Sequence, residues 1–268
     1  MGTRKEEIKL KAQAERDARN KKAKRSRIVF QLGIVGILLA AATVIALVVV
    51  TSTGAASVTP ANMAGGGVRF EGGSLTPLAS KSTDEFKIKT APLSKEAVDV
   101  RIYVDYLCPF CNQFEQTYGD YLTGLVSSGD VALEYHPISI LDRLSVGTKY
   151  STRAAAASAC VADNSPKSWL DYNNALFANQ PEENSEGLTD KDLATLATTA
   201  GASEAAAKCI IDGDYVGWAG KNTKAATTEI PFINQGLQST PTITVNGKLF
   251  DGSSTDFTEY INGLIAAE

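Results

Sequence analysis

The chain has 268 residues, of which 44% are hydrophobic and 21% are charged, as is usual for globular proteins. Residues 1–27 hold eleven basic and four acidic residues, a net charge of +7. The remaining fifteen basic and twenty-six acidic residues give −11. An acidic body repels phosphate groups, so this balance argues against a nucleic-acid-binding protein.

The first predicted element is a stretch of 23 uncharged residues at 28–50. A helix of that length measures roughly 34 Å, which is enough to cross a bilayer core of about 30 Å. The stretch is longer than the apolar core of a cleaved signal peptide, and only the weak candidate TGAAS at 53–57 follows it. Because the basic arm precedes the stretch, we predict a single-pass cell-membrane anchor with a cytosolic N-terminus and an extracytoplasmic head.

Beyond the anchor, local patterns predict a linker, two strands and a helix. Residues 51–73 are rich in Gly, Ala, Ser and Thr without a hydrophobic period, so we expect a flexible linker. Alternating apolar residues predict a strand over 98–104. From Pro109 onward apolar residues recur every three to four positions, which predicts a helix that stops at Gly129. A second strand is predicted at 131–138.

The second half of the chain is mostly helical in pattern. Residues 144–235 are Ala-rich, and Thr189 and Ser203 are typical N-caps of helices in this block. Asn246-Gly247 between two apolar runs predicts a hairpin with a type I′ turn, and an amphipathic helix follows. The order strand, helix, strand, helical block, hairpin, helix predicts an α/β fold interrupted by a helical insertion.

Cys108 and Cys111 stand where the strand at 98–104 meets the following helix. Unsatisfied N–H groups and the helix dipole at such a junction favour a thiolate, which is the reactive form of cysteine. Pro109 is tolerated there because the first turn needs no N–H donor. We expect Cys108 to be the attacking sulfur and Cys111 to resolve the mixed disulfide. This chemistry requires neither a metal nor a cofactor.

Two other uses of the Cys-x-x-Cys motif are less favoured. A structural disulfide between residues so close closes a very short loop and contributes little stability. A zinc site normally needs a second Cys or His pair, but Cys160 and Cys209 are isolated and His136 is the only histidine. A redox couple is therefore the favoured interpretation.

The segments DYLCPFC and STPTITVNGK, on either side of the helical block, resemble the DsbA-like branch of the thioredoxin superfamily over roughly residues 85–268. The basic arm, the anchor and the additional cysteine pair are similar to membrane-tethered actinobacterial members. The resemblance implies an α/β thioredoxin-like fold with an inserted all-helical domain, preceded by one transmembrane helix. We expect a cytosolic arm at 1–27, the anchor at 28–50, the linker at 51–73, a thioredoxin-like domain at 74–143 and 236–268, and the helical domain at 144–235.

The resemblance also implies roles for particular residues. Pro241 matches a cis-proline that faces the active disulfide, and Thr240 matches a residue whose backbone pairs with the substrate peptide. Strongly oxidising members often have His where this chain has Phe110, and a phenyl ring supplies no positive charge to a thiolate. We therefore expect a Cys108 pKa between the values of about 7 in thioredoxin and about 3.5 in DsbA. Phe110 is expected to contact unfolded substrates, with simple packing as the alternative.

Three further titratable side chains lie near the cysteines or the predicted strands. Asp105 could accept a proton during the attack by Cys111, although an acid at a strand end more often only satisfies the turn. Glu115 is a weaker candidate for the same role. His136, the only histidine, is expected to be a packed residue.

Cys160 and Cys209 form the second pair. Thiols outside the cytosol tend to be oxidised, and an even cysteine count suggests pairing. A bridge between them would close a loop of about 50 residues and stabilise the fold by roughly 4 kcal/mol. We therefore predict that Cys160–Cys209 is the structural disulfide.

The sequence as a whole predicts an extracytoplasmic protein-disulfide oxidoreductase that acts on unfolded or reduced exported proteins. A membrane or small-thiol redox partner would recharge its couple. A reductase or isomerase of the same fold remains open, because the direction of transfer depends on that partner. A non-catalytic thioredoxin-like binding module is the alternative from another class.

Overall fold

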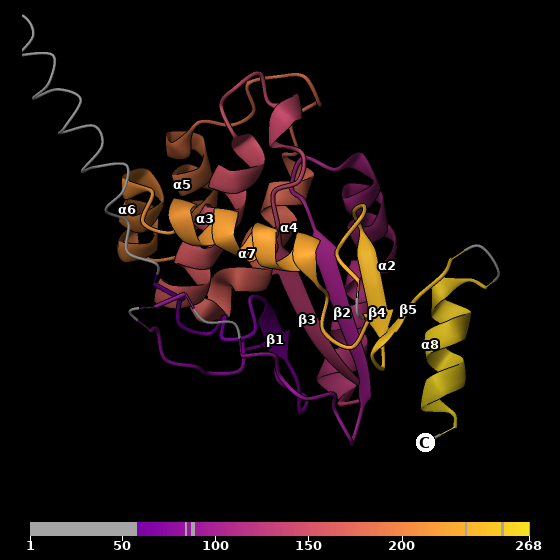
Figure 1. Ribbon diagram of the computed structural model, residues 1–268. Helices are drawn as coiled ribbons and strands as arrows, with labels where there is room; N and C mark the ends of the chain where they lie inside the picture. The colour runs from indigo at the N-terminus through magenta and orange to yellow at the C-terminus, as the bar shows by residue number, and fades with distance from the viewer. Residues whose placement is uncertain (1–57, 84, 87–88, 234, 253–254, 268) are drawn as a thin grey trace, which may run out of the picture. The chain divides into compact units, whose positions relative to one another are not determined.

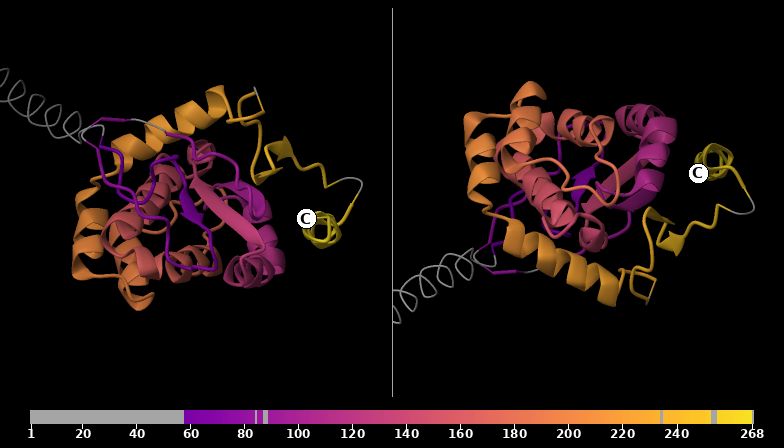
Figure 2. Two further views of the ribbon diagram at one scale, coloured as in Figure 1. Left: turned by 90° about the horizontal axis from the view of Figure 1, so that it is seen from below. Right: turned by 90° about the horizontal axis from the view of Figure 1, so that it is seen from above.

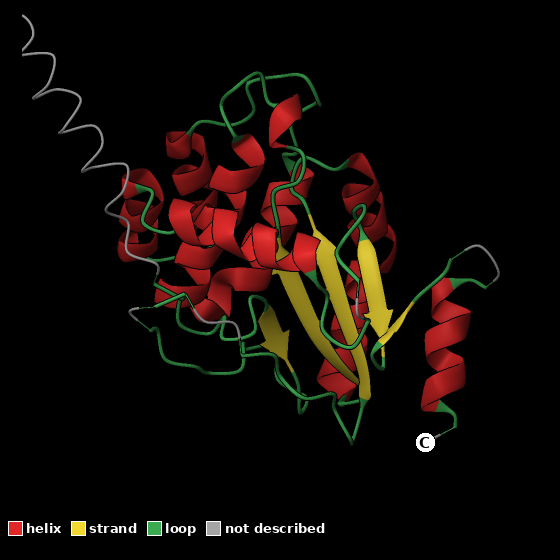
Figure 3. Ribbon diagram, viewed as in Figure 1, coloured by secondary structure: helices red, strands yellow, loops and turns green. Residues whose placement is uncertain are grey.

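A five-stranded mixed sheet runs through the head, with the strand order β1-β3-β2-β4-β5 (Figure 1, Figure 3). The computed structural model describes residues 58–83, 85–86, 89–233, 235–252 and 255–267. The strands are β1 (Val68–Phe70), β2 (Val98–Val104), β3 (Val131–Pro137), β4 (Thr242–Val245) and β5 (Lys248–Leu249). The two strands predicted before the helical block, β2 and β3, pair in parallel, and β2 also pairs antiparallel with β4.

Both faces of β2 are buried, although the alternating pattern predicted only one apolar face. The even-numbered side chains of β2 join the main apolar core, as expected. The other face carries Asp99 and Arg101. The Asp99 carboxylate accepts hydrogen bonds from Arg69 Nη2 at 2.9 Å and from Arg101 Nε at 2.8 Å, and Arg69 also reaches Glu134 at 3.2 Å. Mutual pairing of these charges offsets the cost of removing them from water.

The helix after β2 and the C-terminal hairpin form as predicted. Helix α2 (Pro109–Ser128) covers the face of even-numbered β2 side chains and ends at Gly129, which has the left-handed φ of 89°. Asn246 and Gly247 connect β4 to β5 with φ angles of 48° and 72°, as a type I′ turn requires. Helix α8 (Phe257–Ile265) packs beside α2, with the Phe257 and Phe114 ring centroids 5.3 Å apart.

The described elements between β3 and β4 are all helical, as the Ala-rich pattern predicted. They are η1 (Asp142–Leu144), α3 (Tyr150–Asn164), η2 (Pro166–Ser168), α4 (Trp169–Ala178), α5 (Asp190–Thr199), α6 (Glu204–Asp212) and α7 (Val216–Thr228). The Thr189 and Ser203 side chains cap α5 and α6. Helix α7 crosses the sheet face opposite α2, where Ala226 packs with Tyr103 (Figure 1, Figure 2).

The structure differs from the flexible linker expected at 51–73. Residues 58–73 belong to the folded head: Met63 is completely buried, and β1 pairs antiparallel with β3. Val68 and Phe70 of β1 enter the core, and Arg69 between them joins the buried charge network. This alternation is short and follows several glycines, so the sequence pattern did not reveal it. Within the described ranges no helix is long and apolar enough to span a membrane, and the predicted anchor at 28–50 lies outside those ranges.

Candidate active site

Cys108 occupies the N-cap position of α2, directly after the turn that follows β2. Its backbone is extended, with φ −80° and ψ 115°, and Pro109 is the first helical residue. The Cys108 carbonyl oxygen accepts hydrogen bonds from the N–H groups of Cys111 at 3.1 Å and Asn112 at 3.2 Å. The chain therefore switches from strand to helix where the sequence predicted, and Cys108 stands at the positive end of the helix dipole.

The two thiols of this turn are free and have opposite acidities. A hydrogen bond with Cys111 is the main cause that lowers the pKa of Cys108 to about 6, against the opposing effect of burial. Burial raises the pKa of Cys111 well above its usual value. Near neutral pH the arrangement therefore favours a thiolate on Cys108 and a proton on Cys111. The value at Cys108 falls inside the interval that the sequence predicted.

Thr240 and Pro241 lie against Cys108, although they are more than a hundred residues away in the chain. The Cys108 Sγ atom is 3.2 Å from the Thr240 carbonyl oxygen. The Thr240–Pro241 peptide bond is cis. A cavity of about 340 Å³ adjoins this bond, lined by Pro241 together with apolar side chains that include Leu237 and Phe250. The cavity thus adjoins the peptide bond whose carbonyl oxygen lies beside the sulfur.

Asp105 is completely buried at the start of the turn that leads to Cys108. Its Oδ1 accepts a hydrogen bond from the Leu107 N–H, and its Oδ2 accepts one from the Leu141 N–H, each at 2.9 Å. Burial raises the pKa of this carboxyl to about 6, and the Cys108 charge acts in the same direction. The carboxylate therefore holds the turn, and it also titrates in the range where it could exchange a proton with the cysteines.

Of the remaining predicted residues, Phe110 lies in this turn and His136 lies away from it. The Phe110 side chain is 70% exposed on the first turn of α2, so it contributes little to the packing of the core. His136 lies at the end of β3 and is buried, with its ring stacked on Tyr103 at a centroid distance of 4.3 Å. Thus Asp105, Phe110 and the Thr240–Pro241 bond gather around the cysteines, whereas His136 belongs to the packed sheet.

Comparison with known proteins identifies the fold around this turn. The thioredoxin family model matches residues 94–263, which is more than half of the chain.

The chain belongs to the thioredoxin family.

Solved structures of this family give a closer match. Reduced DsbA from Mycobacterium tuberculosis is 29% identical with a TM-score of 0.59, and the match covers 76% of this chain and 92% of that one. The disulfide bond oxidoreductase DsbG of the same organism is 30% identical with a TM-score of 0.55, over 65% and 84% of the two chains. MdbA, a thiol-disulfide oxidoreductase from Corynebacterium diphtheriae, has a TM-score of 0.56 at 20% identity and supports the fold alone. The resemblance to DsbA-like thiol-disulfide oxidoreductases that the sequence predicted is confirmed.

A curated relative with a different name shares part of the chain. The serine/threonine-protein kinase PknE of Mycobacterium tuberculosis is 37% identical over 146 residues, which are 53% of this chain and 25% of the kinase. The thioredoxin-family chain therefore spans only a quarter of the length of the curated relatives that it matches. The kinase name describes that longer protein.

Sequence reasoning missed Gln180, which follows α4 and reaches the active-site turn. Its Nε2 donates to the carbonyl oxygens of Cys108 at 2.9 Å and Tyr106 at 3.1 Å. It also lies 3.3 Å from the Asn112 side chain. A single glutamine in a polar loop gives no sequence signal for such a contact. The helical block thus directly supports the turn that carries the cysteines.

Glu115, the weaker proton-acceptor candidate of the two acids, has a buried position that the sequence did not indicate. It is buried one turn beyond Cys111, where both carboxylate oxygens accept from the Tyr135 hydroxyl at 3.1–3.2 Å and Oε1 also accepts from Asn173 at 3.2 Å. Asn173 in turn accepts from the Tyr106 hydroxyl at 3.0 Å. Burial raises the pKa of Glu115 to about 7. This buried network connects α2 to β3 and α4 behind the cysteine turn.

The second cysteine pair lies apart from this turn. Cys160 of α3 and Cys209 of α6 form a disulfide, with the sulfurs 1.99 Å apart and the Cα atoms 5.7 Å apart. Both residues are buried among the packed helices. The bond joins two helices of the block between β3 and β4.

Proposed function

We propose that this thioredoxin-family protein is an extracytoplasmic thiol:disulfide oxidoreductase that passes a disulfide to exported proteins through Cys108 and Cys111. The observation that carries the proposal is the opposite acidity of two cysteines on one helical turn. The pKa of Cys108 is lowered to about 6, whereas that of Cys111 is raised. A low thiol pKa makes Cys108 both a good nucleophile at neutral pH and a good leaving group.

The transfer moves two electrons and converts two substrate thiols into one disulfide. In the oxidised enzyme a substrate thiolate attacks the Cys108 sulfur, the Cys108–Cys111 bond breaks, and Cys111 leaves as a thiolate that takes up a proton. A second substrate thiolate then attacks the substrate sulfur of the mixed disulfide and releases the Cys108 thiolate. The substrate is oxidised and the enzyme is left reduced. In the reverse direction Cys108 attacks and Cys111 resolves the mixed disulfide, and Asp105 is a candidate proton acceptor in that step.

Substrate contacts are assigned to the groups around the sulfur. The Thr240 backbone beside Pro241 would pair with an extended peptide, and the exposed Phe110 ring would contact apolar side chains of an unfolded client. The hydrophobic stretch at 28–50 would anchor the protein in the cell membrane with its N-terminus in the cytosol. A membrane or small-thiol partner would reoxidise the couple, and its potential would decide whether oxidation, reduction or isomerisation prevails.

A measured reduction potential together with a trapping variant tests this function. Equilibration of the full chain with glutathione should give a potential between about −270 and −120 mV, the range that separates thioredoxin from DsbA. In the native envelope, Cys111→Ala should accumulate mixed disulfides with exported proteins, because the resolving thiol is missing. The matched control is the double variant Cys108→Ala/Cys111→Ala, which should trap none.

The same experiments separate the alternatives. A non-catalytic binding module predicts no thiol-linked partner in the Cys111→Ala strain and slow alkylation of reduced Cys108 at neutral pH. A reductase or isomerase predicts trapped partners together with a potential near the reducing end of the range. Absence of any trapped partner, with the variant present at normal levels, would overturn the catalytic proposal.

A further inference from the structure

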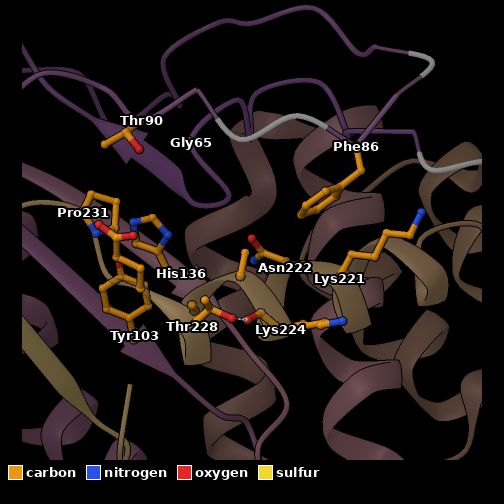
Figure 4. Close-up of a pocket in the computed structure, with 13 residues that line it drawn as sticks. Gly65, Phe86, Thr90, Tyr103, His136, Lys221, Asn222, Lys224, Thr228 and Pro231 are labelled. Atoms are coloured by element: carbon orange, nitrogen blue, oxygen red, sulfur yellow. Dashed lines mark hydrogen bonds between the residues drawn. The ribbon is translucent and has the colours of Figure 1, made fainter. Parts of the chain in front are cut away.

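A cavity of about 750 Å³ lies on the sheet face opposite α2. Figure 4 shows its walls: Tyr103 and His136 from β2 and β3, side chains of α7, and Phe86 from the segment that precedes β2. Its lining shares no residue with the cysteine turn or with the Thr240–Pro241 bond. A volume in this range is typical of sites for small organic ligands.

One end of the cavity carries a buried nitrogen that has no hydrogen-bond partner. His136 is only 4% exposed, and its Nε2 makes no hydrogen bond with any described residue. The Glu134 carboxylate is close by, with its Oε1 3.3 Å from that nitrogen. Burial lowers the pKa of His136, so the ring is neutral at physiological pH. A buried polar atom without a partner is costly, and a ligand that hydrogen-bonds to it recovers that cost.

The end of the cavity opposite His136 is cationic, and the lining as a whole is mostly apolar. Figure 4 shows Phe86 across the cavity from His136, with the amines of Lys221 and Lys224 on the Phe86 side. Within the described chain, Lys224 forms no ion pair. Ala225 and Ala226 also line the cavity, and Glu229 is the single acidic residue of the lining. The lining therefore favours a mostly apolar ligand that carries a negative charge near Lys224.

We propose that this cavity binds a small amphipathic monocarboxylate that carries a hydrogen-bonding oxygen at its far end. The carboxylate would lie near Lys224, the apolar body would pack against Phe86 and Ala225, and the distal oxygen would bond to His136 Nε2. The site adds a binding function to the head that is independent of the thiol chemistry.

Calorimetric titration of the full chain with 10-hydroxydecanoate tests the site. We expect one molecule to bind per chain. Decanoate lacks the distal hydroxyl and should bind about five- to tenfold more weakly, the effect of one buried hydrogen bond. The methyl ester of 10-hydroxydecanoate lacks the charge and should bind about two- to fivefold more weakly, as expected for an exposed ion pair.

Variants locate the binding in the cavity. Ala225→Phe fills the space and should abolish binding, whereas Thr227→Phe, an exposed position of α7 outside the lining, should preserve it. Lys224→Gln should reduce the affinity about two- to fivefold and remove the preference for the acid over its ester. Lys167→Gln, an exposed lysine outside the lining, is its control.

The alkylation rate of Cys108 serves as a folding control for every variant, because the cavity lining does not include the cysteine turn. Absence of saturable binding to the wild-type chain would overturn the proposal. Equal affinities for the acid and its ester, or equal binding by folded Ala225→Phe and Thr227→Phe, would also overturn it.

Discussion

The two cysteine pairs are buried to a similar degree but differ in chemistry. Cys108 and Cys111 are 4% and 1% exposed, and Cys160 and Cys209 are 1% and 6% exposed. Burial therefore does not decide which pair is reactive. Cys108 stands at the N-terminus of α2, whereas Cys160 and Cys209 lie in the C-terminal halves of α3 and α6. The helix dipole favours a thiolate at the first position and disfavours it at the other two.

The largest difference between the pairs should appear in turnover. We expect Cys108→Ser to reduce insulin disulfide reduction by about a thousandfold or more, because a serine hydroxyl is not ionised at neutral pH. The double variant Cys160→Ala/Cys209→Ala should keep most of the wild-type rate at a temperature where it is folded. The comparison fails if the two variants lose activity equally while both give native circular dichroism spectra.

The next largest effect should appear in the pH dependence of Cys108 alkylation, because this thiol is unusually acidic. With a pKa of about 6, roughly 90% of this thiol is ionised at pH 7, against about 1% for a pKa near 9. We expect the iodoacetamide alkylation rate of the reduced protein to rise with a midpoint near pH 6 and to level off by about pH 8. A midpoint near pH 9 would contradict the role assigned to the helix N-terminus and to the hydrogen bond from Cys111.

The same acidity predicts how the stability of the reduced protein depends on pH. The pKa of Cys108 is lower in the folded chain than its ordinary value of 9.0. The thiolate therefore contributes stability that is fully present above about pH 9 and is lost as the pH falls through about 6. Denaturant unfolding of the reduced wild type and of Cys108→Ser should diverge over this window, with the wild type gaining stability as the pH rises.

The sequence predicted the cysteine turn because its causes are local. Alternation over β2, the helical period after Pro109 and the position of Cys108 between them are all contained in about thirty residues. The hairpin at Asn246-Gly247 was predictable for the same reason, since two adjacent residues specify the turn. Such features need no knowledge of the tertiary packing.

Features that depend on distant partners could not be predicted. Arg69 looked like part of a linker, because its partners Asp99 and Glu134 are 30 and 65 residues away. Gln180 contacts the Cys108 carbonyl across 72 residues. The burial of Glu115 depends on Tyr135 and Asn173. From the sequence alone each of these polar residues is expected to be solvent-exposed, because its partner comes close only in the folded chain.

The second cysteine pair should affect stability more than chemistry. Removing the Cys160–Cys209 bond by the double alanine variant should lower the free energy of unfolding by about 4 kcal/mol, because the bond closes a loop of 49 residues. Denaturant titration of the oxidised wild type and the variant measures this loss. The matched control is the double variant Cys108→Ala/Cys111→Ala, for which we expect a much smaller loss because the loop is so short.

A variant of Gln180 tests whether the helical block and the Cys108–Cys111 turn are independent. Gln180 belongs to the helical block and hydrogen-bonds to that turn. Gln180→Ala removes donors to the Cys108 and Tyr106 carbonyl oxygens and should lower the free energy of unfolding by about 1–2 kcal/mol. The exposed Gln238, which among the described residues bonds only to the nearby Gly236 carbonyl, provides the control Gln238→Ala with a loss below about 0.5 kcal/mol. If the helical block also positions the reactive sulfur, Gln180→Ala should shift the midpoint of Cys108 alkylation, whereas Gln238→Ala should not. An unchanged midpoint alongside the stability loss would mean that the block supports the turn mechanically and leaves the acidity of Cys108 to α2 alone.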